Sequence, residues 1–337
     1  MSVTTSAYAS DALPGETVDV VVIGGGAAGL NGALMLARSR RSVVVIDSGT
    51  PRNAPAAAMH GFIVLDGMPP AEILKRGREQ VREYGGRIVL GEVASAEPAD
   101  PAPDADLRFT VTLADGRTVT ARRLLVATGL RDVLPDVPGL AGHWGQGVVH
   151  CPYCHGWEVR DEPIGILATG PASVHHALLF RQLTDDLVYF TRDTDLDEGT
   201  RARFAARGIR VVDAPVREVV EGEDGGVAGV RLADGTFVAR RVLAVATRMQ
   251  ARAEGLHGLK LPMEELPDGM GCRFASGTAG TTEVAGVWVA GNATDLAAQV
   301  GASAAAGALA GSHINALLAT ADTDAALAAA QGETTTH

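Results

Sequence analysis

The stretch that decides the fold runs from Val18 to Asp47 and reads VDVVVIGGGAAGLNGALMLARSRRSVVVID. Five of its first six residues are Val or Ile, which is typical of a parallel strand buried on both faces. A Gly-x-Gly-x-x-Gly loop, a largely apolar segment and a second strand that ends in an acid follow it. Strand, glycine loop, helix, strand and acid within about 30 residues are the fingerprint of a dinucleotide-binding unit.

The glycines and the acid of this unit have separate physical roles. Gly24 permits the tight turn after the strand, and Gly26 lets backbone N–H groups approach a pyrophosphate. Gly29 allows the helix to pack closely on the strand, and Asp47 can accept hydrogen bonds from ribose hydroxyls. In this context we interpret the loop as a nucleotide site rather than as a glycine-rich turn that binds nothing.

The chain contains a second copy of this arrangement. Residues 113–129 (LADGRTVTARRLLVATG) and 232–248 (LADGTFVARRVLAVATR) both combine an Asp-Gly turn, a basic strand edge and a buried strand that ends in Ala-Thr. Each lies downstream of a strand–turn–helix unit, the first starting at Val18 and the second at Ile164. We therefore predict an α/β fold with two Rossmann-like dinucleotide-binding domains, the second inserted into the first.

The composition excludes several classes of protein. The formal net charge of −11 repels phosphate backbones and argues against a nucleic acid as partner. The sequence lacks any run of about 18 apolar residues, so we expect no membrane-spanning segment. Residues 1–17 lack the basic and apolar regions of a signal peptide. We therefore expect a cytoplasmic protein, in which structural disulfides are rare.

Two of the three cysteines form a Cys-x-x-Cys motif, Cys151 and Cys154. In a cytosolic α/β protein this spacing indicates either redox chemistry or half of a metal site. His150 and His155 flank the pair and could complete a zinc site. Alternatively, they could take protons from thiols and return them, because an imidazole titrates near neutral pH. The nucleotide fingerprint favours the redox interpretation, without a metal.

Together these motifs resemble the low-molecular-weight thioredoxin reductases over nearly the whole chain. The resemblance rests on the Gly24–Gly29 loop, on Ala127-Thr128-Gly129, on the cysteine pair within the second unit and on Val287–Asn292 (VWVAGN). In that family the Ala-Thr-Gly motif lines the FAD site, the C-terminal strand holds the ribityl chain and the flavin, the cysteine pair is redox-active, and the protein is a homodimer. The resemblance therefore implies an FAD-dependent redox enzyme that forms homodimers.

The same resemblance implies the domain boundaries. Residues 1–132 form the first part of an FAD-binding domain, and residues 259–320 form its second part. Residues 133–258 form an inserted, degenerate NAD(P)-like domain that carries the cysteine pair. The low-complexity Ala/Thr/Asp segment at residues 321–337 is expected to be a flexible tail.

The resemblance also assigns residues to the cofactor. Asn292 stands where the reductases have an Asp, and its amide can still hydrogen-bond a ribityl hydroxyl. The residues implied to bind FAD are Gly24, Gly26, Ala27, Ala28, Gly29, Asp47, Ser48, Asn53, His60, Val93, Ala127, Thr128, Gly129, Gly291, Asn292, Gln299 and Val300.

The second nucleotide unit departs from the reductases. Residues 168–173 (ATGPAS) stand where they have Gly-x-Gly-x-x-Ala, so the Cβ of Ala168 crowds the turn that would approach a pyrophosphate. An arginine cluster that grips the 2′-phosphate of NADPH in the reductases is reduced here to Arg192 among Asp193, Asp195, Asp197 and Glu198. These carboxylates would repel a phosphate dianion. We predict that NADPH does not bind; NADH, which lacks that phosphate, is less clearly excluded.

The surroundings of the cysteines depart from the reductases as well. His155 stands where they have a proton-donating Asp, and the His-Cys-x-x-Cys-His pattern looks like the FAD-dependent dithiol oxidases of holomycin- and gliotoxin-type pathways. The resemblance implies that Cys151 and Cys154 oxidise a small-molecule dithiol to a disulfide, with His150 and His155 exchanging protons. Electrons would then pass through FAD to dioxygen and give hydrogen peroxide. We expect a fixed domain orientation with Cys154 against the flavin.

Two other functions remain compatible with these residues. A thioredoxin reductase that receives electrons from NADH or another donor would use the same parts. An FAD-binding redox sensor that signals through its cysteine pair to a partner protein would also use them. Reduction of the flavin by a small dithiol and not by NADPH or NADH distinguishes the oxidase from the reductase, and a sensor should form negligible hydrogen peroxide with any dithiol.

Overall fold

The computed structural model describes residues 10–100, 106–192 and 194–334 of the chain. Its first sheet contains the strands β1 (Val18–Ile23), β2 (Val43–Asp47), β3 (Arg87–Leu90), β4 (Val93–Pro98), β5 (Phe109–Leu113), β6 (Thr118–Val126) and β19 (Val287–Val289). They follow the order β3-β2-β1-β6-β5-β4, and β19 pairs with β6. The pairs around β1, β2 and β19 are parallel, whereas β4, β5 and β6 are antiparallel neighbours. Val20, Val21 and Val22 of β1 are fully buried, as the run of β-branched residues predicts.

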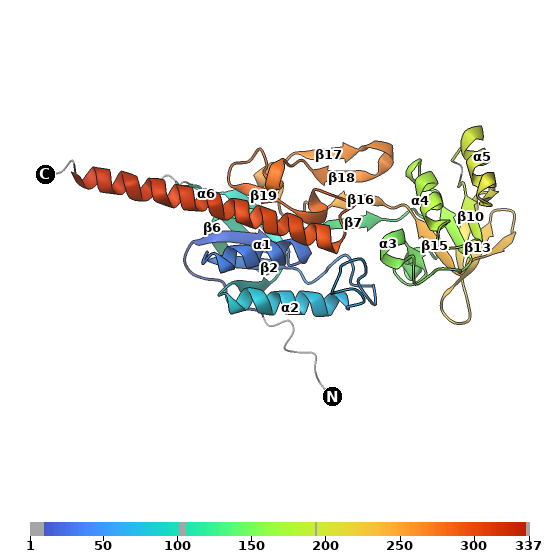
Figure 1. Cartoon of the computed structure of the whole chain (residues 1–337), viewed down its shortest axis with the longest axis horizontal. Coiled ribbons are helices and arrows are strands. Elements are labelled where there is room, and N and C mark those ends of the chain that lie inside the picture. Colours follow the sequence, from blue (N-terminus) through green and yellow to red (C-terminus); the bar gives the residue numbers. More distant parts are fainter. Residues whose placement is uncertain (1–9, 101–105, 193, 335–337) are drawn as a thin grey trace, which may run out of the picture.

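Three helices pack on this sheet: α1 (Ala27–Arg38), α2 (Pro70–Glu83) and α6 (Val300–Thr334). Figure 1 shows α1 and α6 side by side. Glycines of α6 allow this close approach, because a Cβ on Gly307 would lie 1.9 Å from the carbonyl oxygen of Ala28. A Cβ on Gly311 would lie 2.6 Å from the carbonyl oxygen of Gly32. Small residues thus bring the C-terminal helix onto the first nucleotide-binding helix.

The second domain has its own parallel sheet. The sheet contains β8 (Val148–Val149), β9 (Ile164–Leu167), β10 (Leu187–Phe190), β11 (Arg210–Val212) and β15 (Val242–Val245), in the order β11-β10-β9-β15-β8. An antiparallel sheet of β12 (Val216–Glu221), β13 (Val227–Leu232) and β14 (Phe237–Ala239) accompanies it. Its helices are α3 (Pro152–His155), α4 (Ala172–Phe180) and α5 (Glu198–Ala206).

Two strands carry the chain between the domains. β7 (Leu130–Val133) leads out of the first domain and β16 (Arg248–Ala251) leads back, and the two pair antiparallel. They belong to a four-stranded sheet with β17 (Met263–Leu266) and β18 (Gly271–Phe274). The second parallel unit is therefore inserted into the first, and the predicted α/β fold class is confirmed. Short 3₁₀ helices occupy Ala141–His143, His257–Leu259, Pro267–Gly269, Thr278–Gly280 and Gly291–Ala293.

The C-terminal segment differs from the flexible tail predicted for residues 321–337. Helix α6 continues to Thr334, and residues 335–337 lie outside the described residues. Alanine is the strongest helix former, so the low-complexity composition favours a helix here. Asp322 also accepts hydrogen bonds of 2.6 Å from both Arg41 and Arg122, which ties the helix to the first domain.

Candidate active site

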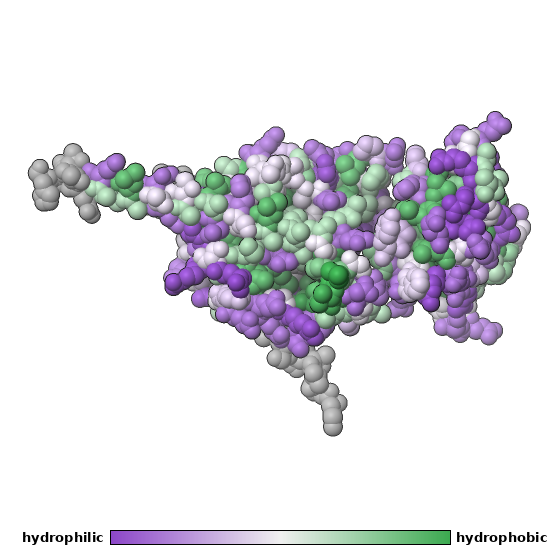
Figure 2. All heavy atoms as spheres, viewed as in Figure 1, coloured by the Kyte–Doolittle hydropathy of each residue, from purple (hydrophilic) through white to green (hydrophobic). Residues whose placement is uncertain are grey.

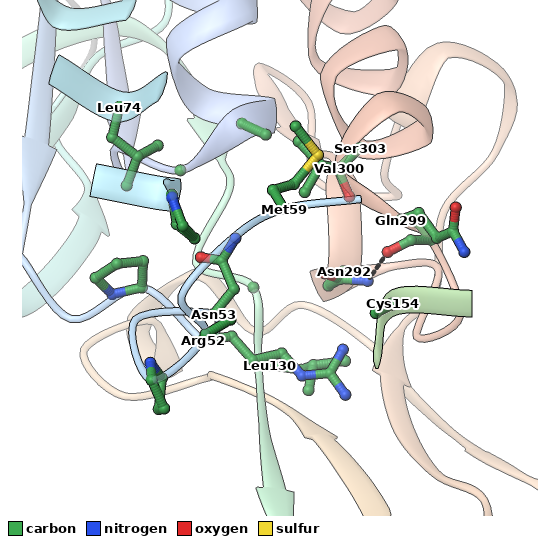
Figure 3. Close-up of a pocket in the computed structure, with 18 of the residues that line it drawn as sticks. Arg52, Asn53, Met59, Leu74, Leu130, Cys154, Asn292, Gln299, Val300 and Ser303 are labelled. Carbon is green, nitrogen blue, oxygen red and sulfur yellow. Dashed lines mark hydrogen bonds between the residues drawn. The ribbon is translucent and has the colours of Figure 1, made fainter. Parts of the chain in front are cut away.

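A cavity lies where the first nucleotide unit, the C-terminal segment and the cysteine segment meet (Figure 3). Most residues expected at the cofactor or at the redox centre line it. These are Gly24, Gly26, Ala27, Ala28, Asp47, Ser48, Asn53, His60, Ala127, Thr128, Gly129, His150, Cys151, Cys154, His155, Asn292, Gln299 and Val300. The fold therefore brings together residues that lie far apart in the sequence.

The glycine loop after β1 has the geometry that a nucleotide site requires. Gly24 has a φ of +110°, and a Cβ there would lie 2.3 Å from the carbonyl oxygen of Ala127, so only glycine fits. A Cβ on Gly29 would lie 1.8 Å from the carbonyl oxygen of Gly24. At Gly26, in contrast, no atom lies within 4 Å of the Cβ position. Gly26 is also the N-cap of α1 and makes no side-chain cap. The start of α1 therefore presents uncapped N–H groups and open space to the cavity.

Asp47 closes the other end of this loop at the end of β2. It is 7% exposed, and its carboxylate accepts a 3.0 Å hydrogen bond from the Gly49 N–H. The buried Arg78 guanidinium of α2 lies 3.6 Å from the second carboxylate oxygen. The carboxylate would overlap a Cβ on Gly25, at 2.5 Å, so it lies directly against the glycine loop. This is the place that the fingerprint assigns to the acid that binds ribose.

The C-terminal segment supplies the opposite wall of the cavity. The Asn292 amide donates to the carbonyl oxygens of Asp295, at 3.0 Å, and of Ala298, at 2.8 Å, so its Nδ2 is used within the chain. Its carbonyl Oδ1 accepts no hydrogen bond from the residues that the structure describes, so it can accept one from a ligand. Ser303 also lines the cavity, and its buried hydroxyl has no partner within the described part of the chain. Figure 3 shows Asn292 and Gln299 next to Cys154.

Three residues expected at the cofactor do not line the cavity. Gly29 and Gly291 instead permit close packing, since a Cβ on Gly291 would lie 2.7 Å from the Cβ of Ala28. Val93 packs against the hydrophobic core of the first domain, and its carbonyl oxygen lies against Gly255. The strand pairing of β4 with β5 fixes this position of Val93, and a motif could not show it.

The cysteine pair forms a disulfide at the start of α3, with a Cα–Cα distance of 5.2 Å. Pro152 occupies the first turn of this short helix, where its missing N–H costs nothing. The Cys154 backbone N–H donates to the Cys151 sulfur at 3.1 Å. Such a contact stabilises Cys151 as a thiolate when the disulfide opens. Both sulfurs are committed to the disulfide, and the described residues contain no group of three or more His, Cys, Asp or Glu that could hold a metal ion.

Two histidines accompany the disulfide. Both ring nitrogens of His155 are buried without a hydrogen-bond partner among the described residues, and burial lowers its pKa from 6.5. His150 donates from Nδ1 to the Val245 carbonyl oxygen at 2.9 Å, which leaves the lone pair on Nε2. Burial lowers the pKa of His150 as well. Both imidazoles are therefore neutral near pH 7 and can accept protons from thiols.

A polar cluster behind His150 was not foreseen from the sequence. Arg52 binds the Asp132 carboxylate through two 2.7 Å hydrogen bonds, and the Thr247 hydroxyl donates to the same carboxylate at 2.7 Å. Burial opposes the charge of Asp132, but the Arg52 hydrogen bonds and charge outweigh it, so its pKa is lowered. The Thr247 hydroxyl also lies 3.4 Å from Nδ1 of His150. The cluster connects the first domain, both linking strands and the cysteine segment.

His176 of α4 is a second unforeseen residue. It is buried, and its Nε2–H donates to the backbone carbonyl of His150, directly before Cys151. Burial lowers its pKa to about 4. The sequence pattern did not indicate this contact, because it depends on how α4 meets the cysteine segment.

The second glycine-type loop is closed by its own side chains. The Thr169 N–H donates to the Ser173 hydroxyl at 2.9 Å, and the Ala168 carbonyl accepts from the Arg192 guanidinium at 2.9 Å. Asp197, one of the carboxylates expected around Arg192, caps α5 by accepting from the Thr200 N–H at 2.8 Å. Asp193 lies outside the described residues. The Thr169 N–H and the Arg192 guanidinium thus form hydrogen bonds within the chain, which stabilise the fold of this loop.

Comparisons with known proteins agree with this architecture. Residues 18–310 match the family model described as pyridine nucleotide-disulphide oxidoreductase. The chain is 36% identical over 259 residues to "Thioredoxin reductase tcpT" of Claviceps purpurea, covering 75% of this chain and 79% of that protein. It is 30% identical over 311 residues to "Thioredoxin reductase sirT" of Leptosphaeria maculans, covering 88% and 93%.

A solved structure gives a match of similar extent. "Crystal structure of HlmI" superposes with a TM-score of 0.88 at 44% identity and covers 96% of this chain and 99% of that one. The expected resemblance to the thioredoxin reductases is confirmed, and the protein is an oxidoreductase. None of the described helices is both long and apolar enough to cross a membrane. With its paired nucleotide units and its Cys-x-x-Cys disulfide, the chain belongs to the pyridine nucleotide-disulphide oxidoreductase family.

Proposed function

We propose that this protein is an FAD-dependent dithiol oxidase that closes a disulfide in a small-molecule dithiol and passes the electrons to dioxygen. One observation carries the proposal. The disulfide and two neutral histidines share a cavity with an open nucleotide loop, whereas in the second nucleotide loop the Thr169 N–H donates to Ser173 and the Ala168 carbonyl accepts from Arg192. We therefore expect the electrons to come from a dithiol that reacts at the disulfide, and not from NADPH bound at the second nucleotide loop.

The first cavity has the parts that FAD needs. The uncapped N–H groups at Gly26–Ala28 would hold the pyrophosphate, and Asp47 would accept from ribose hydroxyls. Asn292, Gln299 and Val300 would lie at the flavin end, beside Cys154. Bound FAD supplies the two-electron acceptor that dioxygen reoxidises with release of hydrogen peroxide.

The thiol chemistry begins on the resting disulfide. His155 takes the proton of one substrate thiol, because only a thiolate is a competent nucleophile. The thiolate attacks the Cys151 sulfur, the Cys151–Cys154 bond breaks, and Cys154 leaves as a thiolate. The second substrate thiol then attacks the mixed disulfide, with His150 or His155 accepting its proton. The products are a cyclic disulfide and the reduced cysteine pair.

The residues around Cys151 suit this sequence. The Cys154 N–H that points to the Cys151 sulfur stabilises the Cys151 thiolate released in the second step. His176 holds the His150 carbonyl and thereby the backbone before Cys151. Bound FAD would accept the two electrons left on the cysteines, and His150 and His155 would give up the two protons that dioxygen needs to become hydrogen peroxide. The balance is one dithiol and one dioxygen consumed for one disulfide and one hydrogen peroxide formed.

Thioredoxin-disulfide reductase activity with NADH or another donor is the second candidate. The names of two relatives, both "Thioredoxin reductase", favour it. The acid-rich segment near Arg192 would repel the 2′-phosphate of NADPH. NADH lacks this phosphate and would not be repelled in the same way.

We further propose that the protein acts as a homodimer. In Figure 2, strongly hydrophobic atoms are exposed near the end of α2 that faces the second domain. Ile63 and Val64, in the loop before α2, are 85% and 91% exposed, and α6 exposes Leu309 and Leu317. Exposed apolar surface of this kind is typical of an interface.

Anaerobic stopped-flow reduction tests the function. A small dithiol such as dithiothreitol should bleach the flavin absorbance, and NADPH and NADH should not. In air, one hydrogen peroxide should form for each disulfide. Rapid bleaching by a pyridine nucleotide would return the protein to the reductases, and the absence of peroxide with every dithiol would support a redox sensor.

A further inference from the structure

A second cavity, of about 350 Å³, adjoins the cysteine pair. It shares Cys154, His155 and His60 with the first cavity and contains none of the residues of the Gly24–Gly29 loop. Its volume is in the range of small-molecule sites. Both domains contribute to it. The first supplies Ala57, Ala58 and His60, and the second supplies Gly145, Gln146, Gly147, Val149, Cys154, His155, Glu158, Val159, Glu162, Arg241 and Val242. A molecule in this cavity would touch Cys154, whereas Cys151 lines only the first cavity, so the thiols of a bound dithiol would have to extend from the second cavity into the first to attack Cys151.

The charged groups of the second cavity do not balance. Glu158 lies 3.3 Å from Nε2 of His60, and Arg241 forms a 2.9 Å ion pair with Asp224. The carboxylate of Glu162 has neither an ion pair nor a hydrogen bond within the described part of the chain. His155 adds no positive charge, since burial keeps its imidazole neutral near pH 7. The side chains that line this cavity therefore carry a net negative charge, and Glu162 is exposed to solvent.

We propose that this second cavity binds the substrate dithiol and that Glu162 makes it select neutral and cationic dithiols over dithiols that carry a carboxylate. The inference rests on the proposed function and specifies its substrate class. A substrate carboxylate within about 6 Å of Glu162 would be repelled, and its binding affinity would fall several-fold. The effect is of this moderate size because the site is partly open to solvent and its effective dielectric is intermediate. An amide N–H or an ammonium at the same place would meet an unused acceptor.

Two dithiols that differ in one charge test the selection. Dihydrolipoamide and dihydrolipoate have the same ring-forming thiols, but the second carries a carboxylate. We expect kcat/KM for anaerobic flavin reduction, measured at low ionic strength, to favour dihydrolipoamide by about five- to tenfold. Dithiothreitol and its amino analogue 2-amino-1,4-butanedithiol extend the series to a cation, which should react at least as well as the neutral compound.

A comparison of the wild type, E162Q and E83Q then distinguishes the effect of the Glu162 charge from the effect of the protein's net charge. In E162Q the preference for dihydrolipoamide should fall to less than about twofold, mainly through a lower KM for dihydrolipoate. E83Q removes an equal charge from the exposed far end of α2 and should keep the wild-type preference. Equal rates for both dithiols in the wild type, or an unchanged preference in E162Q, would overturn the inference alone. Failure of every dithiol to reduce the flavin would overturn the proposed function and the inference with it.

Discussion

In the first nucleotide unit, the loop after β1 leaves its N–H groups and the space above Gly26 open to a cavity, whereas the corresponding loop after β9 is filled by its own chain. Ser173, which aligns with Gly29, accepts the Thr169 N–H and is completely buried. Arg192 donates to the carbonyl of Ala168, the residue that aligns with Gly24. The two units share strand order and connections, but in the second the Thr169 N–H and the Ala168 carbonyl are already bonded within the chain.

The helices after the two loops differ in the same way. α1 starts at the open loop and packs on α6 through glycines. α4 starts with Pro171 at its N-cap and carries His176, which holds the His150 carbonyl beside the disulfide. If the second unit binds no dinucleotide, as we propose, these internal hydrogen bonds would preserve its fold in place of those to a ligand. The second unit has become the support of the cysteine pair.

Substitution of Cys151 should have the largest effect on dithiol-driven flavin reduction, because in our proposal the cysteine pair is the part of the second unit that reacts with the substrate. We expect C151S to bind FAD normally but to lose dithiol-driven flavin reduction by at least about a thousandfold, because no thiol exchange can begin. Flavin absorbance measures the first property and stopped-flow reduction the second. C272S, which changes the cysteine of β18 outside both cavities, is the matched control. A C151S rate within tenfold of the wild type would contradict the proposed role.

The support role of α4 predicts a dependence of stability on pH. The pKa of His176 is lowered to about 4 in the folded protein, so the unfolded chain binds this proton first as the pH falls. The contribution to unfolding free energy is full above about pH 6.5 and is lost toward pH 4, by up to about 3 kcal/mol. H176Q, whose amide can still donate to the His150 carbonyl, should therefore lose less stability than the wild type over this range.

Thermal unfolding between pH 4 and 7 measures this difference. H175Q changes the exposed neighbour on the same helix and should follow the wild-type profile. If H176Q and H175Q lost stability in parallel on acidification, the buried histidine would not be the group that titrates.

The contrast between the loops can also be tested with one substitution at two aligned positions. G26A would fill the open space at the start of α1, and we expect FAD affinity to fall by about tenfold or more, with little change in the apoprotein's unfolding temperature. G170A places the same methyl group in the second loop, where the nearest atom, the Asp268 carbonyl oxygen, lies 3.6 Å away. It should leave FAD affinity unchanged. Equal losses in both variants would mean that Gly26 does not face the cofactor.

The sequence predicted the parts of the site that local patterns determine. β1, the glycine loop, Asp47 and the cysteine pair follow from short-range chemistry, because each needs particular residues at fixed spacing. The Arg52–Asp132–Thr247 cluster could not be predicted in this way, since its members come from segments that meet only when the domains are oriented.

Two expectations differ from the structure, the first for a long-range reason and the second for a partly local one. Val93 was assigned to the cofactor by resemblance, but the pairing of β4 turns it into the core of the first domain. The predicted flexible tail is helical through Thr334, where alanine propensity and the contacts of Asp322 favour a helix. Composition alone does not distinguish a frayed segment from a helix with anchoring side chains.

The smallest expected effect comes from returning a glycine to the second loop. A168G removes the Cβ that crowds the turn, yet the Ser173 hydroxyl still occupies the Thr169 N–H, and the acidic residues around Arg192 still repel phosphate. We therefore expect no detectable NADPH binding in A168G by isothermal titration calorimetry, and no flavin reduction by NADPH. Saturable NADPH binding after this single change would show that one methyl group, and not the internal hydrogen bonds, keeps the dinucleotide out. The loss of the ligand would then be reversible in one step, and the two loops would differ far less than their hydrogen bonds indicate.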